Sequence, residues 1–573
     1  MNFTFALSEK ELKERTHPSA FTSYNMLDEN AQQYNDLPLY EKKVLEYLVH
    51  ASDIIDRVAL KMDHPYNIKF EQFLKDEIAK GNKQAKMTMD LFRGQRGIFG
   101  HERNGNSVAL TNDVEQRLGR GFYPYDLSVP EFHDILINML NNGQDAQVRK
   151  ILNQRSIVKR NGNQLIAQDY TQAFQNEFRE VAFLLNCAAH ITQHPEFKEY
   201  LRLQASALSD YKPYKDCVAD KKWATLQSGP LEFTLGRESY DDAMTPTVLN
   251  NPQLKAMLDE RGITPYPKDT LGTTVGIVDK AGTDYLLKIK EYLPILATKM
   301  PRGSEYKQTI SKDTKQTMVD VDLVTVGGHV GTYRGGITLA FNLPNADKLA
   351  VKTGGGHRTV YLKQMRNSKY SDGLKKKLDA LLAPEFHKYF SVPALHDFTI
   401  LHENMHTLGP KENLESLGQY KNIIEEHKAD AGSVAMLDEL VRCGFFTPQQ
   451  KKEILTSWLV AYLYPAANFK TAHSKRNIMQ HNMLFESGAI KLDKTGRLVI
   501  DFNRVTDRSH KMLADVIDIQ LSGDPEKARK YIEKYAVWSQ PLQTLGSKLS
   551  VIDTHRNSYI TELLADRIRQ FTI

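Results

Sequence analysis

The most informative stretch of this chain is LHENMHTLGP at positions 401–410, which contains His402-Glu403-Asn404-Met405-His406. It restricts the possible folds and reactions more than any other stretch does. Residues four apart lie on the same face of a helix, so the imidazoles of His402 and His406 can reach one metal ion. Glu403 follows the first histidine and can flank an open coordination position. The pattern predicts a zinc site on a helix, with Glu403 as the general base.

A second segment, Glu425-Glu426-His427-Lys428-Ala429-Asp430, offers a third ligand. Catalytic zinc commonly uses two histidines and one glutamate and leaves one position for water. Either Glu425 or Glu426 can serve, but only one of them can face the ion. Asp430 lies one helical turn after Glu426, where its carboxylate can accept the spare N–H of a ligand histidine and orient the ring. This arrangement favours Glu426 as the ligand, with Glu425 and Asp430 as supporting carboxylates.

These residue types indicate hydrolysis of an amide bond. Zinc lowers the pKa of a bound water to about 7, and Glu403 is the group placed to take its proton. The attacking oxygen adds to a carbonyl carbon, and Glu403 then passes the proton to the leaving amine. The developing oxyanion needs a hydrogen-bond donor, which the motif does not identify. The two segments predict a zinc-dependent peptidase that holds one zinc ion per chain.

Composition excludes several other classes of protein. The 573 residues are 41% hydrophobic and 25% charged, which is typical of globular proteins with about two to four domains. Lys and Arg exceed Asp and Glu by only 75 − 70 = 5, without a concentrated basic region, so we expect no nucleic-acid partner. The apolar stretch Trp458–Phe469 is too short to span a membrane. Three cysteines in unrelated contexts (Cys187, Cys217 and Cys443) and the lack of a signal-peptide pattern predict a cytoplasmic protein.

The hydrophobic pattern changes twice along the chain. The first two hundred residues are mainly helical, with helices expected over 170–191 and 196–208 and another beginning after Ser128. The middle of the chain contains short segments rich in Val, Thr, Leu and Phe, which predict strands: Leu231–Leu235, Met318–Val326, Gly336–Leu343 and Arg358–Leu362. The helical pattern returns from about Asp372, with one further strand at Arg497–Phe502. The chain is therefore expected to belong to the α+β class.

Five motifs, in this order and at comparable spacing, resemble those of the dipeptidyl peptidase III family of metallopeptidases. They are Gly121-Phe122-Tyr123-Pro124, Gly229-Pro230 followed by Glu238-Ser239-Tyr240-Asp241-Asp242, Asn342-Leu343-Pro344-Asn345, Ile424 to Asp430, and Ala472-His473 ahead of Leu484-Phe485-Glu486-Ser487-Gly488. The chain also departs from the family, which mostly has H-E-x-x-G-H where this sequence has H-E-x-x-H. Lys428 replaces the family's arginine. Arg476 falls one position earlier than another family arginine, with Asn477 in its place, so neither is assigned to the site.

The resemblance implies further site residues. His402, His406 and Glu426 would bind zinc, as the spacing already indicates. Tyr240 would donate its hydroxyl to the oxyanion, and His473 would contact the substrate near the scissile bond. The free ammonium group of the substrate would be held by acceptor oxygens of Glu238, Asn342 and Asn345. Fixing the ammonium at one distance from the zinc would release dipeptides from the N-terminus.

The resemblance also implies an architecture of two lobes around a wide cleft. One lobe would be mostly helical and bind zinc, and the other would contain a small five-stranded β-barrel with helices. We expect the barrel lobe to comprise residues 1–258, 326–371 and about 546–573. The zinc-binding lobe would comprise 259–325 and 372–545. Short peptides are the expected partners, and we expect a monomer that binds neither nucleic acid nor membrane.

Two alternatives to a dipeptidyl peptidase remain open. The first is a zinc endopeptidase, or another hydrolase on the same scaffold, which a preference for substrates with blocked N-termini would support. The second is a peptide-binding protein that holds zinc but has little turnover. The intact H-E-x-x-H motif argues against this second alternative, because a purely structural site has no use for the base.

Overall fold

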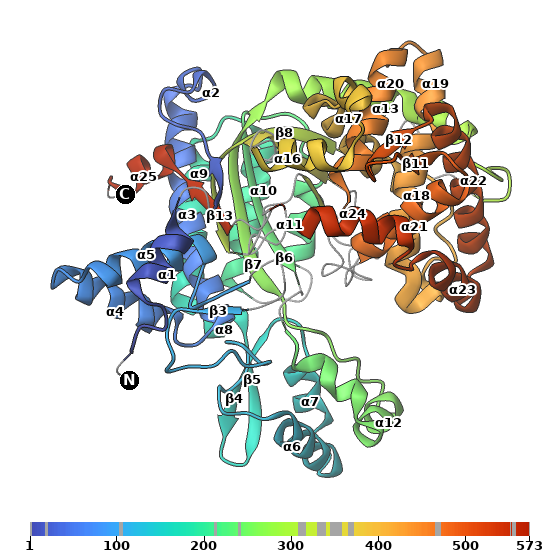
Figure 1. The fold of residues 1–573 in the computed structure, drawn as a ribbon. Coiled ribbons are helices and arrows are strands. Elements are labelled where there is room, and N and C mark those ends of the chain that lie inside the picture. Colours follow the sequence, from blue (N-terminus) through green and yellow to red (C-terminus); the bar gives the residue numbers. More distant parts are fainter. Residues whose placement is uncertain are drawn as a thin grey trace. The chain divides into compact units, whose positions relative to one another are not determined.

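The computed structural model describes the chain in two compact units (Figure 1). The first unit contains Met1–Asp279, Val319–Gln364 and Arg556–Ile573, and the second contains Lys280–Met318 and Met365–His555. The predicted α+β class is confirmed, since helices dominate and the sheets are small. The described residues are 3–17, 21–101, 107–210, 215–238, 242–306, 317–328, 340–343, 358–364, 372–463, 472–550, 552 and 557–571.

A five-stranded sheet organises the first unit, with the strands hydrogen-bonded in the order β6-β7-β8-β10-β9. The strands are β6 (Leu231–Glu238), β7 (Thr270–Asp279), β8 (Thr317–Gly328), β9 (Ala340–Leu343) and β10 (Arg358–Leu362). The pairs β6/β7, β7/β8 and β10/β9 are antiparallel. Four of these strands include the segments expected from the sequence, although residues 336–339 of the third predicted strand lie outside the described residues. β6 and β9 stand at the two ends of the order.

Within this five-stranded sheet, β7 is the strand that the sequence did not predict. Its first eight residues are all buried, so it lacks the alternation of polar and apolar side chains that identifies a half-exposed strand. Gly276 lies at a shift in the register between β7 and β8. A Cβ atom there would lie 2.3 Å from Val321 Cγ1, so close approach of the two strands requires glycine. The expected boundary after residue 258 precedes β7, whereas the structure keeps this strand with the rest of its sheet and ends the segment at Asp279.

Helices pack in succession against this sheet. α3 (Leu39–Asp63) packs against β7, α9 (Gln175–Ile191) packs against α3, and α10 (Pro195–Ser209) packs against α9. The Tyr200 hydroxyl donates to Phe233 O of β6 at 2.9 Å, and Ser52 Oγ lies 2.6 Å from Thr273 Oγ1 of β7. Both contacts are buried, and they fix the sheet to its helical cover.

The remaining elements of the first unit are shorter. α6 (Val129–Asn141) begins after Ser128, as predicted, because Ser128 Oγ accepts from Glu131 N. The others are α1 (Glu9–Thr16), β1 (Phe21–Asn25), α2 (Gln32–Asn35), α4 (Asn67–Ala79), α5 (Lys83–Gln95), β2 (Phe99–His101), β3 (Ser107–Ala109), α7 (Asp145–Ile151), β4 (Ser156–Asn161), β5 (Gln164–Asp169), α8 (Tyr170–Ala173), α11 (Lys215–Trp223), η2 (Thr245–Asn250), α12 (Pro252–Glu260), β13 (Asn557–Thr561) and α25 (Leu563–Arg569). β1 and β13 pair in parallel, so segments from the two ends of the chain share one small sheet.

The second unit is built on α17 (Val392–Met405) and α18 (Lys421–Ala435). These two helices pack against each other, and α18 also contacts α21 (Ala472–Glu486) and α22 (Phe502–Ser522). The other elements are α13 (Lys280–Thr298), α16 (Asp372–Leu381), η3 (Pro384–Tyr389), η4 (Glu415–Tyr420), α19 (Leu437–Arg442), α20 (Pro448–Ala461), β11 (Ile490–Leu492), β12 (Leu498–Ile500), α23 (Pro525–Tyr535) and α24 (Gln540–Ser550).

The strand expected at Arg497–Phe502 is shorter than predicted. It covers Leu498–Ile500, and Phe502 already belongs to α22 because the Asp501 side chain accepts from Arg504 N and caps that helix. Across the described residues, no helix is both long enough and apolar enough to cross a membrane.

Candidate metal centre

The histidines of the H-E-x-x-H motif stand at the end of α17. Ser391 caps the helix through its side chain, and a proline follows within its first turn. His402 lies in the last turn and His406 is the C-cap residue, still with helical backbone angles (φ −60°, ψ −24°). Phe398, one turn before His402, stacks on Trp458 of α20 with ring centroids 5.7 Å apart. This packing holds the end of α17 in place while both imidazoles point to one side.

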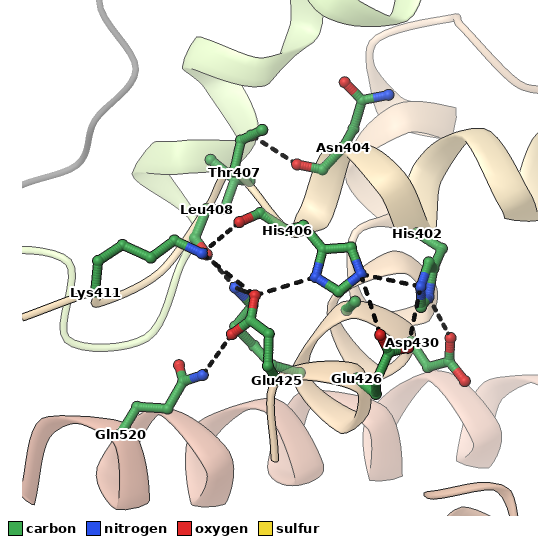
Figure 2. Close-up of polar contacts among 12 residues, drawn as sticks. His402, Asn404, His406, Thr407, Leu408, Lys411, Glu425, Glu426, Asp430 and Gln520 are labelled. Atoms are coloured by element: carbon green, nitrogen blue, oxygen red, sulfur yellow. Dashed lines mark hydrogen bonds and ion pairs between the residues drawn. The ribbon is translucent and has the colours of Figure 1, made fainter. Parts of the chain in front are cut away.

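Ligand atoms of three side chains converge where α17 meets α18 (Figure 2). His402 Nε2 lies 3.1 Å from His406 Nε2 and 3.4 Å from Glu426 Oε2, and His406 Nε2 lies 3.8 Å from Glu426 Oε1. One ligand atom from each residue lies within 4.8 Å of the other two. No second such group of His, Cys, Asp and Glu side chains occurs in the part of the chain that the structure describes.

The spacing of these atoms fits a tetrahedral metal ion. Zinc binds histidine nitrogen and carboxylate oxygen at about 2.1 Å, so two ligands at the tetrahedral angle lie about 3.4 Å apart. The separations of 3.1, 3.4 and 3.8 Å span this value. Two neutral imidazoles and one carboxylate are also the donor set of many catalytic zinc sites. The residues present therefore fit a single metal ion.

Each histidine is oriented by a carboxylate from α18. His402 Nδ1 donates to Asp430 Oδ1 at 2.6 Å, and His406 Nδ1 donates to Glu425 Oε1 at 3.1 Å. These bonds leave both Nε2 atoms facing Glu426 (Figure 2). Burial opposes a charged imidazole, but the carboxylates of Asp430 and Glu426 outweigh it and raise the pKa of His402 to about 10. The surroundings thus favour positive charge at this position.

Glu425 has several further donors. The buried Lys428 Nζ donates to its Oε1 at 2.7 Å, Lys411 Nζ lies 3.3 Å from the same oxygen, and Gln520 Nε2 of α22 donates to Oε2 at 2.7 Å. Burial alone would raise the pKa of Glu425, but the charges of Lys428 and Lys411 hold it well below the ordinary value. Glu425 therefore stays anionic beside His406.

α21 contributes two residues on the other side of Glu426. His473 Nδ1 lies 3.1 Å from Glu426 Oε2, with its side chain 64% exposed. Arg476 Nη1 donates to the same oxygen at 2.7 Å, and its side chain is 3% exposed. Arg476 is not among the site residues that the sequence motifs predict. Its spacing of three from His473 on a helix was the available signal, since residues three apart share a helix face.

The structure describes the remaining predicted residues only in part. Glu403 follows His402 on α17 and is half-buried. Tyr240 and Asn345 lie outside the described residues. For Glu238 and Asn342 only the backbone is described: Glu238 ends β6, and Asn342 in β9 pairs with Thr359 of β10. Glu238 and Asn342 belong to the first unit, whereas Glu403 and the three candidate metal ligands belong to the second.

Among the solved structures that resemble this chain, two match it over nearly its whole length. Dipeptidyl peptidase III from Caldithrix abyssi is 23% identical, with a TM-score of 0.80, covering 96% of this chain and 98% of that one. The chain has the dipeptidyl peptidase III fold. The enzyme of the same name from Corallococcus sp. strain EGB is 21% identical, with a TM-score of 0.75 and 99% of both chains covered. The family resemblance seen in the sequence is thus confirmed in the fold.

Sequence comparison adds one curated relative. Nudix hydrolase 3 of Arabidopsis thaliana is 22% identical over 564 residues, which cover 88% of this chain and 68% of the plant protein. No family model matches the chain. At 21–23% identity the two solved structures establish the fold alone, and the chemistry depends on the residues of this chain.

Proposed function

We propose that this chain is a zinc-dependent peptidase that releases dipeptides from the N-terminus of short peptides. The observation that carries this proposal is the convergence of His402, His406 and Glu426 on a scaffold with the dipeptidyl peptidase III fold. The spacing of their ligand atoms supports zinc as the ion. When bound, zinc would acidify a water molecule and polarise the carbonyl of the substrate.

The residues around these ligands hold them ready for the ion. Asp430 and Glu425 each accept the Nδ1 proton of one histidine, which leaves the two Nε2 atoms as metal donors. These hydrogen bonds fix the orientation of the two rings, so that both Nε2 atoms face the proposed metal position. Glu426 would complete the set from the facing helix.

Glu403 is the proposed general base. It follows His402 on the same helix and is half-buried, so its carboxylate can lie beside the metal site without replacing a ligand. It would take a proton from the attacking water and return that proton to the leaving amine. We propose Tyr240 as the donor to the developing oxyanion and His473 as a substrate contact near the scissile bond. The contact of His473 with Glu426 supports a position close to the metal centre.

The exopeptidase part of the proposal depends on the first unit. We propose that Glu238, Asn342 and Asn345 hold the free ammonium group of the peptide, for which their oxygens are suitable acceptors. The position of β9 at one end of the strand order supports this, because such a strand can add an extended peptide through its backbone. Fixing the ammonium would set the length of the released fragment.

The alternatives differ in what they require of the substrate. An endopeptidase on this scaffold would not need a free ammonium group, and a peptide-binding protein would hold zinc without turnover. The name of the plant relative points to another hydrolase class, but the match leaves 100 − 68 = 32% of that protein uncovered. No feature of the described site favours that class. Short peptides as partners, a monomeric state and a cytoplasmic location remain predictions from the sequence.

The test compares a short peptide with its N-acetylated form, using zinc-loaded full-length protein. Glu403→Gln preserves the shape of the side chain but removes the base, and Glu412→Gln, at an exposed glutamate, is the matched control. We expect dipeptide release only from the free peptide, lost in Glu403→Gln with zinc still bound and retained in Glu412→Gln.

Each other outcome removes a defined part of the proposal. Cleavage of the acetylated peptide would remove the ammonium site and favour an endopeptidase. Binding of both peptides without cleavage, by zinc-loaded protein, would favour a peptide-binding protein. Full activity of Glu403→Gln would exclude Glu403 as the base.

A further inference from the structure

Arg476 connects two acidic residues of α18 from the neighbouring helix α21. Its Nη1 donates to Glu426 Oε2 at 2.7 Å, and its Nε lies 3.0 Å from Asp430 Oδ2. Arg476 is 3% exposed and Asp430 is fully buried, so water screens these contacts weakly. One guanidinium group thus contacts both a candidate metal ligand and the carboxylate that orients His402.

The two carboxylates need a cation between them. Glu426 and Asp430 lie one helical turn apart on α18, and like charges at this spacing repel each other. The repulsion is greater in a buried site, where the dielectric constant is low. The guanidinium group of Arg476 contacts both carboxylates and therefore helps to hold them close together.

The guanidinium group is itself held in a fixed orientation. Its Nε–H donates to Asn477 Oδ1 at 3.1 Å, so the 3.0 Å contact with Asp430 is an ion pair beside that bond. The guanidinium carbon also lies 5.6 Å from the ring centroid of Tyr462. A planar group with several nitrogens at fixed angles suits this arrangement, and a lysine ammonium does not.

We infer that Arg476 is a positioning residue for the metal centre. It holds Glu426 Oε2 on the side of α21 and links Glu426 to Asp430. The position of the candidate ligand Glu426 is thereby coupled to that of Asp430, which orients His402. This inference rests on the proposed metal site. It adds a residue that the family motifs did not bring into the site, because Arg476 is displaced by one position from the family's arginine.

The test uses the metal itself and measures affinity rather than activity. Full-length apoprotein is titrated with Co²⁺ and Zn²⁺ in competition with a chelator, and the visible absorption spectrum of the Co²⁺ form reports the ligand geometry. The variants are Arg476→Met, which removes the charge, and Arg476→Lys, which keeps the charge on a single nitrogen. Arg508→Met is the matched control, because this arginine of α22 is 9% exposed and bonds Glu486 and Met483 O but none of the proposed metal-site residues.

Loss of a group that orients a metal ligand typically weakens binding about 10- to 100-fold. We expect this loss in Arg476→Met, a smaller one in Arg476→Lys, an altered Co²⁺ spectrum in both, and parental values in Arg508→Met. Parental affinity and spectrum in folded Arg476→Met would overturn the inference. Should Arg476→Met fail to fold, Arg476→Lys decides, because parental values there would show that two fixed nitrogens are not required.

The failure of the metal site itself gives a different result. His402→Ala is the reference variant for that question, since it deletes a proposed ligand. If the parent binds metal no better than His402→Ala, the metal proposal fails and the inference about Arg476 fails with it. If the parent loses affinity on His402→Ala but not on Arg476→Met, only the inference about Arg476 is wrong.

Discussion

Gly432 controls how closely α17 and α18 approach each other. A Cβ atom at this position would lie 2.8 Å from Met405 Sδ, 3.3 Å from Met405 Cγ and 3.6 Å from Leu513 Cδ1. Met405 is fully buried and directly precedes His406, while Gly432 lies on the helix that carries Glu426. We therefore expect Gly432→Ala to disturb both the packing of the helices and the geometry of the metal centre.

The size of the effect follows from the overlap. Atoms in ordinary contact are at least about 3.5 Å apart, so the Cβ and Sδ atoms must separate by about 0.7 Å. Overpacking of this kind costs about 1–3 kcal/mol, and the better helix propensity of alanine returns about 1 kcal/mol, so stability should fall by about 1 kcal/mol. Ligand sets tolerate displacements of only about 0.5 Å, so we expect metal affinity to fall about tenfold.

The assay combines urea unfolding of the apoprotein with Co²⁺ titration in competition with a chelator. Ser433→Ala, at the next residue of α18, adds no atom and should leave metal affinity unchanged. Met405→Ala alone should destabilise by about 2–5 kcal/mol, but in Gly432→Ala/Met405→Ala the new methyl group enters the vacated space. The double-mutant cycle should then show favourable coupling of about 1 kcal/mol. Additive effects together with parental metal affinity in Gly432→Ala would refute this account.

Three further predictions concern α17, α18 and the ion. Burial raises the pKa of Asp397 to about 6, despite the hydrogen bond that its carboxylate accepts from Tyr285. The folded state therefore binds this proton more tightly than the unfolded state does. The stability of the protein should fall as the pH rises from about 4 to about 6. Asp397→Asn should remove that loss, so its free energy of unfolding in urea should rise by about 2 kcal/mol relative to the parent between these pH values. Parallel curves of unfolding free energy against pH for the variant and the parent would contradict this prediction. Lys428→Met should destabilise by about 2 kcal/mol in the same assay, because it leaves Leu408 O without the buried donor and Glu425 with fewer cations. Zinc at about 100 times its Kd should stabilise the protein by about 2.7 kcal/mol. A chelator should reverse this stabilisation, and His402→Ala should abolish it. Equal stabilisation of His402→Ala by zinc would show that the ion binds elsewhere.

The local geometry of the site could be predicted because it depends on spacing within single helices. The separation of His402 and His406 by four residues predicted that both rings face one side of α17. The same rule placed Asp430 one turn after Glu426, where it does accept the Nδ1 proton of His402. Motif and helix period suffice to place residues on one face of a helix, whereas the bond between Asp430 and His402 also requires α17 and α18 to pack together.

Features that depend on packing between distant segments were missed. β7 is buried along most of its length, so its sequence carries no alternation to distinguish a strand from other apolar segments. The spacing of Arg476 from His473 indicates that the two share a face of α21, but Arg476 reaches Glu426 only because that face packs against α18. The backbone pairing of Asn342 with Thr359 likewise joins two strands whose register is set by the sheet.

The pairing of β1 with β13 affects how the protein is made. Asn557, the first residue of β13, is synthesised 557 − 25 = 532 residues after Asn25, the last residue of β1. At about 5–20 residues per second, β1 waits about half a minute to two minutes on the ribosome for its partner. During that time its backbone groups are open to wrong pairing or to chaperones. A chain interrupted after His555 would contain all three candidate metal ligands and yet lack β13, the strand that pairs with β1.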